Sequence, residues 1–331
     1  MKRWPLIVLT SVLTACSLID DNLAVCSVNQ RINYQLQVHA DVSMQLQSEL
    51  NATEQESVRD ALQSWLTPIF ADENIDVDLR FFMALTDEPT VQKTEIIKKR
   101  RTSFSITLPK ENFMHLAVAN LNSSPQMQLS GVEHSATERL DIVGDGEMKS
   151  LGSSIYATRL PMEISGDSLQ ELEVELHMIT SVVALVIDHT ECPELLQTEG
   201  SVMGCAGGFC VLDSLFDYTN TLSFRMLDVP VSAKKLPAIR SRREQTAAYR
   251  CLGVVAMPTQ EEQEWQLTVV ATLSGSRHTT NTMTVSTPLQ AGELRILKTR
   301  MNKNGELSFD KDVSVSIELD WNEGGDHEIV L

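Results

Sequence analysis

Long apolar runs are scarce in this chain of 331 residues. After the first residues, no segment approaches the ~20 apolar residues that a membrane-spanning helix requires. The all-apolar run Val182–Ile187 has the length of a buried strand. Aromatic residues make up 5% of the composition and mostly fall in the core register of predicted elements, so few should serve as exposed platforms for sugar rings.

Signatures of common catalytic and metal sites are also missing from the sequence. There is no Gly-x-Ser-x-Gly elbow, no Gly-x-x-x-x-Gly-Lys phosphate loop and no His-Glu-x-x-His. His134 and Glu138 are four residues apart, a spacing that a surface ion pair explains better than a metal does. Asp188-His189 precedes Cys192, but adjacency in sequence is not the geometry of a Cys/His dyad. We therefore expect no enzymatic activity, no metal and no cofactor.

Basic residues are few, with 27 Lys and Arg against 45 Asp and Glu, which gives a formal net charge of −18. A chain of this charge repels phosphate backbones and anionic lipid surfaces, so nucleic-acid binding is not expected. Two basic clusters interrupt the acidic background, at Lys98–Arg101 and Arg240–Arg243. A patch for an acidic partner is one interpretation of the first cluster, but a solvated turn or loop is the commoner explanation for both.

The N-terminus carries the most specific pattern in the chain. Two basic residues precede the apolar run Trp4–Val12, and Leu13-Thr14-Ala15-Cys16 follows, which is the layout of a secretory signal peptide. The tetrapeptide resembles the bacterial lipobox, in which the cysteine receives a diacylglycerol. We predict a signal peptide at residues 1–15 and a lipid on Cys16 that anchors the mature chain. The alternative is an ordinary secreted protein whose cleavage site happens to precede a cysteine.

The remaining cysteines leave disulfide pairing open. Five cysteines follow Cys16, and because five is odd, at least one thiol is free or pairs elsewhere. Cys205 and Cys210 could close a small disulfide loop, or they could be unpaired fillers of a strand. The four residues between them are not a zinc-ribbon spacing.

Periodicity indicates an all-β chain with one helical insertion. Residues 16–30 are polar and acidic and are predicted to form a tether. Residues 53–70 are predicted to form a helix, because Thr53 and Glu56 have capping-box spacing and apolar residues recur every three or four positions. A break near Ser165–Ser168 divides two tandem β-sandwich domains, at 31–165, which includes the helix, and 166–331. The strand candidates are 32–38, 75–83, 102–108, 113–121, 172–178, 182–187, 201–213, 222–229, 249–257, 265–273, 283–289 and 313–319.

The order of these elements resembles the FimB-type fimbrial anchor lipoproteins of Bacteroidales. The resemblance extends over the mature chain as an order of elements, without a single diagnostic motif. It is carried by Cys16 and Cys26 around the acidic tether, the strand Ile32–Val38, the segment Leu172–Ile187, Gly200–Gly204 before Gly207-Gly208-Phe209, and Leu319-Asp320-Trp321 before Gly324-Gly325.

This resemblance implies two transthyretin-like β-sandwiches in a structural protein at the base of a surface fimbrium. It implies attachment to the outer membrane through the lipid at Cys16, on the outer face of the cell. The expected partner is a fimbrial subunit that donates a strand to an incomplete sandwich. Two other functions stay open: a glycan-binding surface lipoprotein of an uptake system, and a secreted hydrolase whose pair of carboxylates the sequence cannot reveal.

Overall fold

The computed structural model describes residues 29–38, 55–70, 73–83, 89–99, 101–131, 138–144, 146–165, 170–231 and 248–317. Several predicted features lie outside these ranges: the signal peptide, Cys16, most of the tether, the break at 166–168, His134 and the cluster Arg240–Arg243. Within the described residues the chain is mostly β-strand with one α-helix, which confirms the predicted all-β class.

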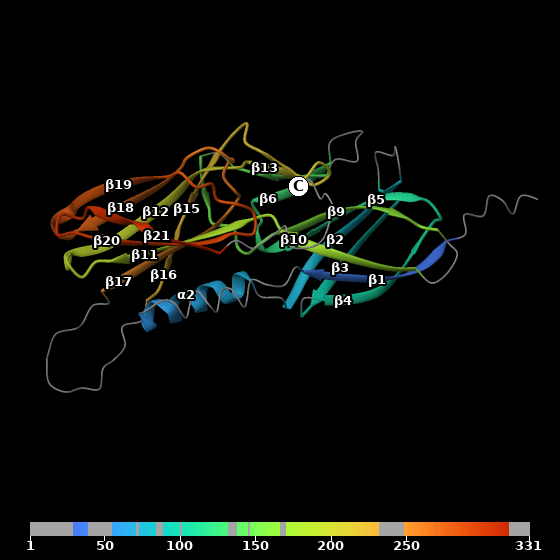
Figure 1. Cartoon of the computed structure of the whole chain (residues 1–331), viewed down its shortest axis with the longest axis horizontal. Helices are drawn as coiled ribbons and strands as arrows, with labels where there is room; N and C mark the ends of the chain where they lie inside the picture. The colour runs from blue at the N-terminus through green and yellow to red at the C-terminus, as the bar shows by residue number, and fades with distance from the viewer. Residues whose placement is uncertain are drawn as a thin grey trace, which may run out of the picture.

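The helix is α2 (Glu56–Ile69), and the strands form four sheets (Figure 1). In chain order the strands are β1 (Gln30–Val38), β2 (Glu73–Met83), β3 (Val91–Lys98), β4 (Arg101–Leu108), β5 (Asn112–Ala119), β6 (Met127–Gly131), β7 (Glu138–Ile142), β8 (Glu147–Lys149), β9 (Tyr156–Glu163), β10 (Gln170–Met178), β11 (Ser181–Asp188), β12 (Leu195–Cys205), β13 (Gly208–Cys210), β14 (Leu215–Asp217), β15 (Leu222–Arg225), β16 (Leu227–Val229), β17 (Tyr249–Ala256), β18 (Trp265–Leu273), β19 (Arg277–Val285), β20 (Leu294–Met301) and β21 (Leu307–Ile317).

A seven-stranded sheet, in the order β3-β2-β5-β9-β10-β1-β4, forms most of the first half. Strand β1 pairs in parallel with β10 and antiparallel with β4. The edge strands β3 and β4 are joined by a tight turn at Lys99 (φ 51°), so the sheet curls until its two edges meet. Lys93 on one edge lies 3.9 Å from the ring centroid of Phe104 on the other. Of the predicted solvated turn Lys98–Arg101, Lys98, Lys99 and Arg101 are exposed, and Arg100 lies outside the described residues.

The inside of this curled sheet holds an aromatic cluster. The inward residues of β1 are buried, as their alternation predicted. Tyr34 stacks on Phe104 with ring centroids 4.8 Å apart, and Phe81 stacks on His115 at 4.1 Å. The Tyr34 hydroxyl hydrogen-bonds to His115 Nε2, and His115 Nδ1 lies 2.9 Å from the carbonyl oxygen of Arg80. These contacts tie β1 to β2, β4 and β5.

A four-stranded sheet, in the order β14-β13-β7-β6, combines strands from both halves of the chain. Arg139 on β7 forms ion pairs with Asp141 on the same strand and with Asp217 on β14. In Figure 1 the labels of β6 and β13 lie near the middle of the long axis of the molecule. Because β13 and β14 complete a sheet begun by β6 and β7, the two halves of the chain are interwoven.

The second half forms a sandwich of two five-stranded sheets, β16-β17-β11-β20-β21 and β19-β18-β12-β15-β8. Strand β11 is buried on both faces apart from its last residue, as its uninterrupted apolar sequence predicted. The sheets approach closely at Gly200, where an added Cβ would lie 3.0 Å from Leu252 Cδ1 and 2.9 Å from Met226 Sδ. The predicted strand 222–229 is two strands, β15 and β16, which belong to different sheets.

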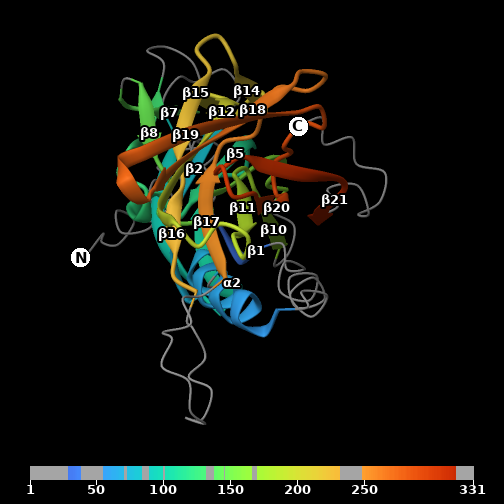
Figure 2. The same cartoon turned by 90° about the vertical axis from the view of Figure 1, so that its left-hand side faces the viewer.

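Helix α2 packs on β16 and β17 of the second half, and Figures 1 and 2 both show it along these strands. The predicted apolar stripe is confirmed, since Val58, Leu62, Leu66 and Ile69 are buried. The helix begins at Glu56, with Gln55 as its N-cap and no side-chain cap on it, and Thr53 of the predicted capping box lies outside the described residues. Glu56 in the first turn complements the positive end of the helix dipole.

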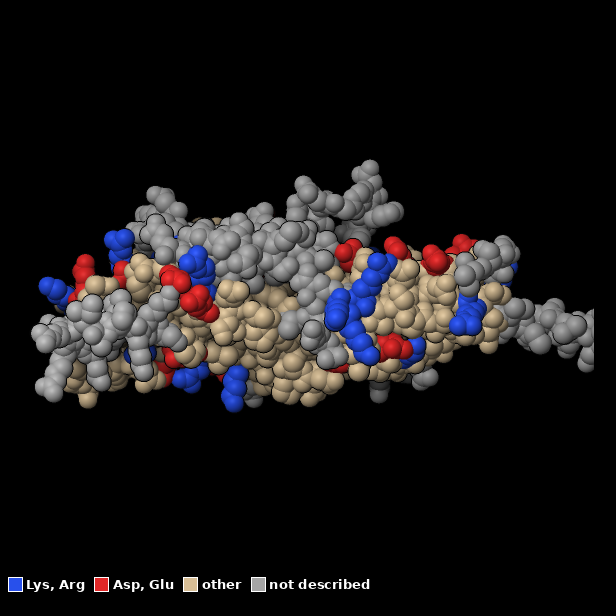
Figure 3. All heavy atoms as spheres, turned by 90° about the horizontal axis from the view of Figure 1, so that it is seen from below, with Lys and Arg blue, Asp and Glu red and all other residues tan. Residues whose placement is uncertain are grey.

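Charges of both signs are mixed on the described surface. Figure 3 shows acidic and basic side chains interspersed on the lower face, with a short row of basic ones toward its right-hand side. Within the described residues, no helix is long and apolar enough to cross a membrane.

Candidate functional site: an open sandwich edge and an end cavity

One side of the second sandwich is closed by the chain itself. Strands β15 and β16 follow each other and differ in sheet, so the chain crosses from one layer to the other between them. At the crossing, the Met226 amide donates to the carbonyl oxygen of Gly200 on β12, 2.8 Å away. This hydrogen bond joins the two layers on this side of the sandwich.

The opposite side has β19 at the edge of one sheet and β21 at the edge of the other. Side chains of β19 connect these edges. Asn281 Nδ2 donates to the Gly305 carbonyl oxygen (3.0 Å), and Asn281 Oδ1 accepts from the Leu307 amide (2.9 Å). Thr279 Oγ1 donates to the same Gly305 oxygen at 2.8 Å. We call this contact, formed by Thr279, Asn281, Gly305 and Leu307, the β19–β21 seam.

Beyond the seam, the inner face of β19 is incompletely covered. Met283 and Val285 are half-buried, although their cross-strand neighbours Leu267 and Trp265 on β18 are almost fully buried. Edge strands present backbone donors and acceptors that another strand can satisfy. An uncovered apolar row beside such an edge is the arrangement that strand addition requires.

A buried ion pair stabilises the sandwich next to this edge. Arg295 and Glu293 are 3% and 2% exposed, and Arg295 Nε donates to Glu293 Oε1 at 2.7 Å. The guanidinium also donates to the carbonyl oxygens of Thr287 and Pro288, each at 2.8 Å. Trp265 Nε1 donates to the same Thr287 oxygen at 2.8 Å. These bonds fix the segment that follows β19 to β18 and β20.

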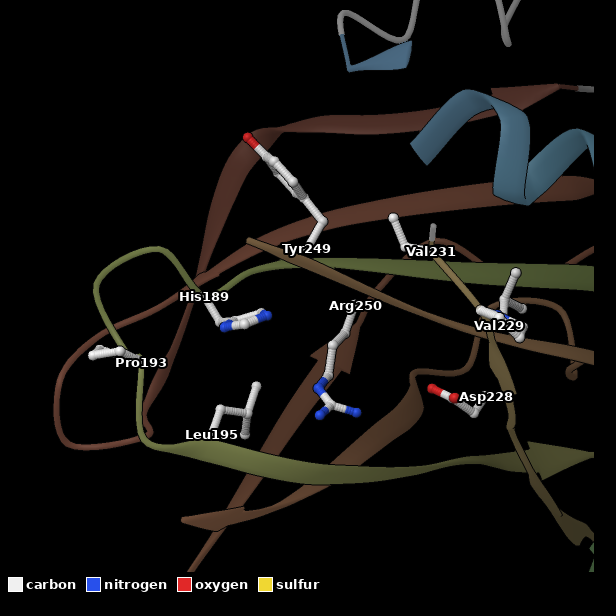
Figure 4. Close-up of a pocket in the computed structure, with 9 residues that line it drawn as sticks. His189, Pro193, Leu195, Asp228, Val229, Val231, Tyr249 and Arg250 are labelled. Carbon is white, nitrogen blue, oxygen red and sulfur yellow. The ribbon is translucent and has the colours of Figure 1, made fainter. Parts of the chain in front are cut away.

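A cavity of about 270 Å³ opens at the end of the second sandwich, between the end of β16 and the start of β17 (Figure 4). Its lining is His189, Pro193, Leu195, Asp228, Val229, Pro230, Val231, Tyr249 and Arg250. Arg250 also donates to the carbonyl oxygen of Leu196 at 2.5 Å. Figure 4 shows the Asp228 carboxylate and the Arg250 guanidinium pointing into the same space, while the Tyr249 hydroxyl points away from it. The cavity can take a small, partly apolar group with polar ends.

Of the five cysteines that follow Cys16, the four that the structure describes, Cys192, Cys205, Cys210 and Cys251, are free thiols, and Cys26 lies outside the described residues. Cys205 ends β12 and Cys210 ends β13, in different sheets, and both thiols are free in the structure. Burial raises the pKa of the Cys205 thiol to about 12. Cys210 is half-buried, and its Sγ donates to Asp213 Oδ2 at 3.3 Å.

The Asp188, His189 and Cys192 segment forms a tight turn. The Cys192 amide donates to the His189 carbonyl oxygen at 2.8 Å, and Asp188 Oδ1 accepts from the Thr190 amide at 2.9 Å. Burial is the main reason that the pKa of the Cys192 thiol is raised, so the thiolate needed for nucleophilic chemistry is disfavoured. Within the described residues, no three His, Cys, Asp or Glu side chains are grouped so that they could hold a metal ion.

Comparisons with known proteins give fold similarity at low sequence identity. No protein-family model matches the chain, and no curated protein matches it in sequence. A candidate adhesin from Bacteroides thetaiotaomicron superimposes with a TM-score of 0.55 and 10% identity, over 84% of this chain and 94% of that one. A candidate polysaccharide-binding protein from the same species has a TM-score of 0.51 and 11% identity, over 85% and 98%.

Solved structures similar to this chain also include the fimbrial anchor protein Mfa2 from Porphyromonas gingivalis. Its TM-score is 0.48 and its identity 10%, over 87% of this chain and 96% of that one. The two superpositions above 0.5 show that the chain shares its fold with these Bacteroides proteins.

Proposed function

We propose that this protein is a lipid-anchored structural subunit at the base of a cell-surface fimbrium, which attaches the first polymerising subunit by accepting a strand from it. The single observation that carries the proposal is the open edge of the second sandwich, where Met283 and Val285 are incompletely covered. The lipobox at Cys16 and the fold shared with a candidate adhesin support it.

The anchor is tested by fractionating cells that carry Cys16→Ala. Removing the acylated sulfur removes the acyl chains, whose burial holds the protein at ~0.8 kcal/mol per methylene. We expect the variant in soluble fractions and the Cys26→Ala control in the membrane. A Cys16→Ala protein that stays in the membrane would contradict lipid anchoring, whatever the fate of the fimbrium.

Glycan capture is the second candidate function, and the end cavity is the observation that favours it. Asp228 and Arg250 could hydrogen-bond sugar hydroxyls, and one structural neighbour is described as a candidate polysaccharide-binding protein. Neither tryptophan of the described residues is an exposed platform for a sugar ring, because Trp65 is half-buried and Trp265 is buried. A glycan array with the purified mature chain discriminates: saturable binding that Arg250→Ala abolishes would support glycan capture.

A further inference from the structure

The Asn281 side chain occupies hydrogen-bonding positions on the β21 side that a strand would otherwise fill. Its Nδ2 donates to the carbonyl oxygen of Gly305, and its Oδ1 accepts from the amide of Leu307. These two backbone groups are two residues apart and both face away from β20. A primary amide, like a peptide unit, offers one donor and one acceptor to an adjacent strand. Asn281 thus substitutes for one backbone residue of an absent strand.

The direction of that absent strand follows from the same bonds. In an antiparallel ladder, a hydrogen-bonded pair exchanges both bonds between the same two residues, whereas the bonds of a parallel ladder are slanted. A residue of a parallel strand therefore donates to one residue and accepts from the residue two further on. Asn281 does this with Gly305 and Leu307, so it imitates a parallel strand residue opposite Glu306.

In the first half of the chain, a side chain of β4 makes an equivalent pair of hydrogen bonds to β3, but there the two strands are already in contact. Thr102 Oγ1 donates to the Ile96 carbonyl oxygen (3.2 Å) and accepts from the Lys98 amide (2.9 Å) on β3. There the turn at Lys99 joins the two edges directly, and Lys93 lies over the Phe104 ring between them. The β19–β21 seam has no such closure in the described residues, and half-buried Met283 and Val285 continue along it.

We propose that the β21 edge, from Leu307 onward, accepts an extended strand from a different protein, that this strand runs parallel to β21, and that its first paired residue displaces the Asn281 amide. Alternate apolar side chains of the incoming strand would cover Met283 and Val285. The inference rests on the proposed function, because it gives the position and direction of the strand addition.

The test uses the mature chain with Cys16→Ser and a synthetic Thr-Val-Thr-Val-Thr-Val-Thr peptide that carries a nitroxide at one end. In NMR spectra, we expect the peptide to slow hydrogen exchange of the β21 amides. A nitroxide at the peptide N-terminus should broaden the Leu307 amide, and one at its C-terminus should broaden amides toward Ile317. Asn281→Ala should tighten peptide binding by about fivefold, because the competing hydrogen bonds are removed. Thr282→Ala, on the outer face of the same strand, should leave the affinity unchanged.

Four results would overturn the inference: the reverse order of broadening, protection at β3 in place of β21, no protection at millimolar peptide, or self-association of the chain through the same amides. The proposed function fails separately. If deleting the gene leaves fimbriae on the cells, the anchor role is wrong. If deletion removes them but the peptide does not bind at β21, only the position of strand addition is wrong.

Discussion

The indole of Trp65 lies on the backbone of Gly253, so helix α2 is packed directly against the outer face of β17. A Cβ added at Gly253 would overlap the six-membered ring of the indole. A glycine is needed here because the ring takes the space of a side chain. The contact fixes a helix from the first half of the sequence to a sheet of the second half.

Substituting Gly253 should therefore loosen the helix. We expect Gly253→Ala to lower the free energy of unfolding by about 1–3 kcal/mol, the cost of overpacking a close contact. Urea denaturation measures this. The double variant Trp65→Ala/Gly253→Ala should be less destabilised than the sum of the two single variants, because the smaller side chain makes room for the new methyl group. Strict additivity would contradict the contact.

His115 makes stability depend on pH. Because the Arg80 carbonyl can only accept, His115 Nδ1 carries the proton, and Nε2 accepts from the Tyr34 hydroxyl. Burial lowers the pKa of His115 from 6.5 to about 4. The unfolded chain thus binds the proton more readily, so stability should fall by about 1.4 kcal/mol per pH unit as pH drops from 6.5 toward 4.

Unfolding free energies measured at pH 7, 6 and 5 test this dependence. His115→Gln should have a smaller slope than the parent chain, even if it is less stable at pH 7. Tyr34→Phe leaves Nε2 without its donor and should cost about 1–3 kcal/mol at neutral pH. Equal slopes for the parent chain and His115→Gln would show that other groups cause the pH dependence.

The buried pair Glu293 and Arg295 predicts an asymmetry between single and double substitution. Arg295→Met alone leaves a buried carboxylate without its charge partner and should cost about 3–5 kcal/mol. Glu293→Leu/Arg295→Met removes both charges and should recover much of that loss. Chemical denaturation of the three proteins checks the order, which would be contradicted if the double variant were the least stable.

The Arg139–Asp217 ion pair should contribute modestly to the four-stranded sheet. Hydrogen bonds from Thr219, and then from Arg139, lower the pKa of Asp217 to about 2. The stabilisation that the ionised Asp217 carboxylate gives to the folded state is therefore complete at neutral pH, and it is lost only as pH falls below about 3.8 toward 2. Because both side chains are about 30% exposed, we expect Asp217→Asn to cost no more than about 1 kcal/mol at pH 7. Asp213→Asn is the matched control, and an equal loss in both variants would contradict this role.

Strongly patterned elements were predictable from the sequence. The apolar stripe of α2 and the inward alternation of β1 are confirmed because each buries one continuous face. The predicted strand 283–289 is displaced, since β19 spans Arg277–Val285. Its sequence is dominated by threonine and carries little apolar alternation, which follows from its position at a sheet edge. Strand β20 was not predicted, although its first four residues are buried.

Pairing partners were not predictable. Strand β8 joins a second-half sheet and β13 joins β7, because local periodicity states which face is buried and not which strand lies alongside. The seam was invisible for the same reason: Asn281 and Leu307 are 26 residues apart in sequence. The one signal of the seam in the sequence was the polar residue Asn281 at an inward position of its strand.

The most direct test of the fimbrial anchor role is detergent extraction of the native protein, followed by mass spectrometry of the proteins that stay bound. We expect a ladder of β-rich subunits that disappears from the cell surface when the gene is deleted. Recovery of the protein alone, or with components of a transporter, would contradict a fimbrial anchor and favour glycan capture.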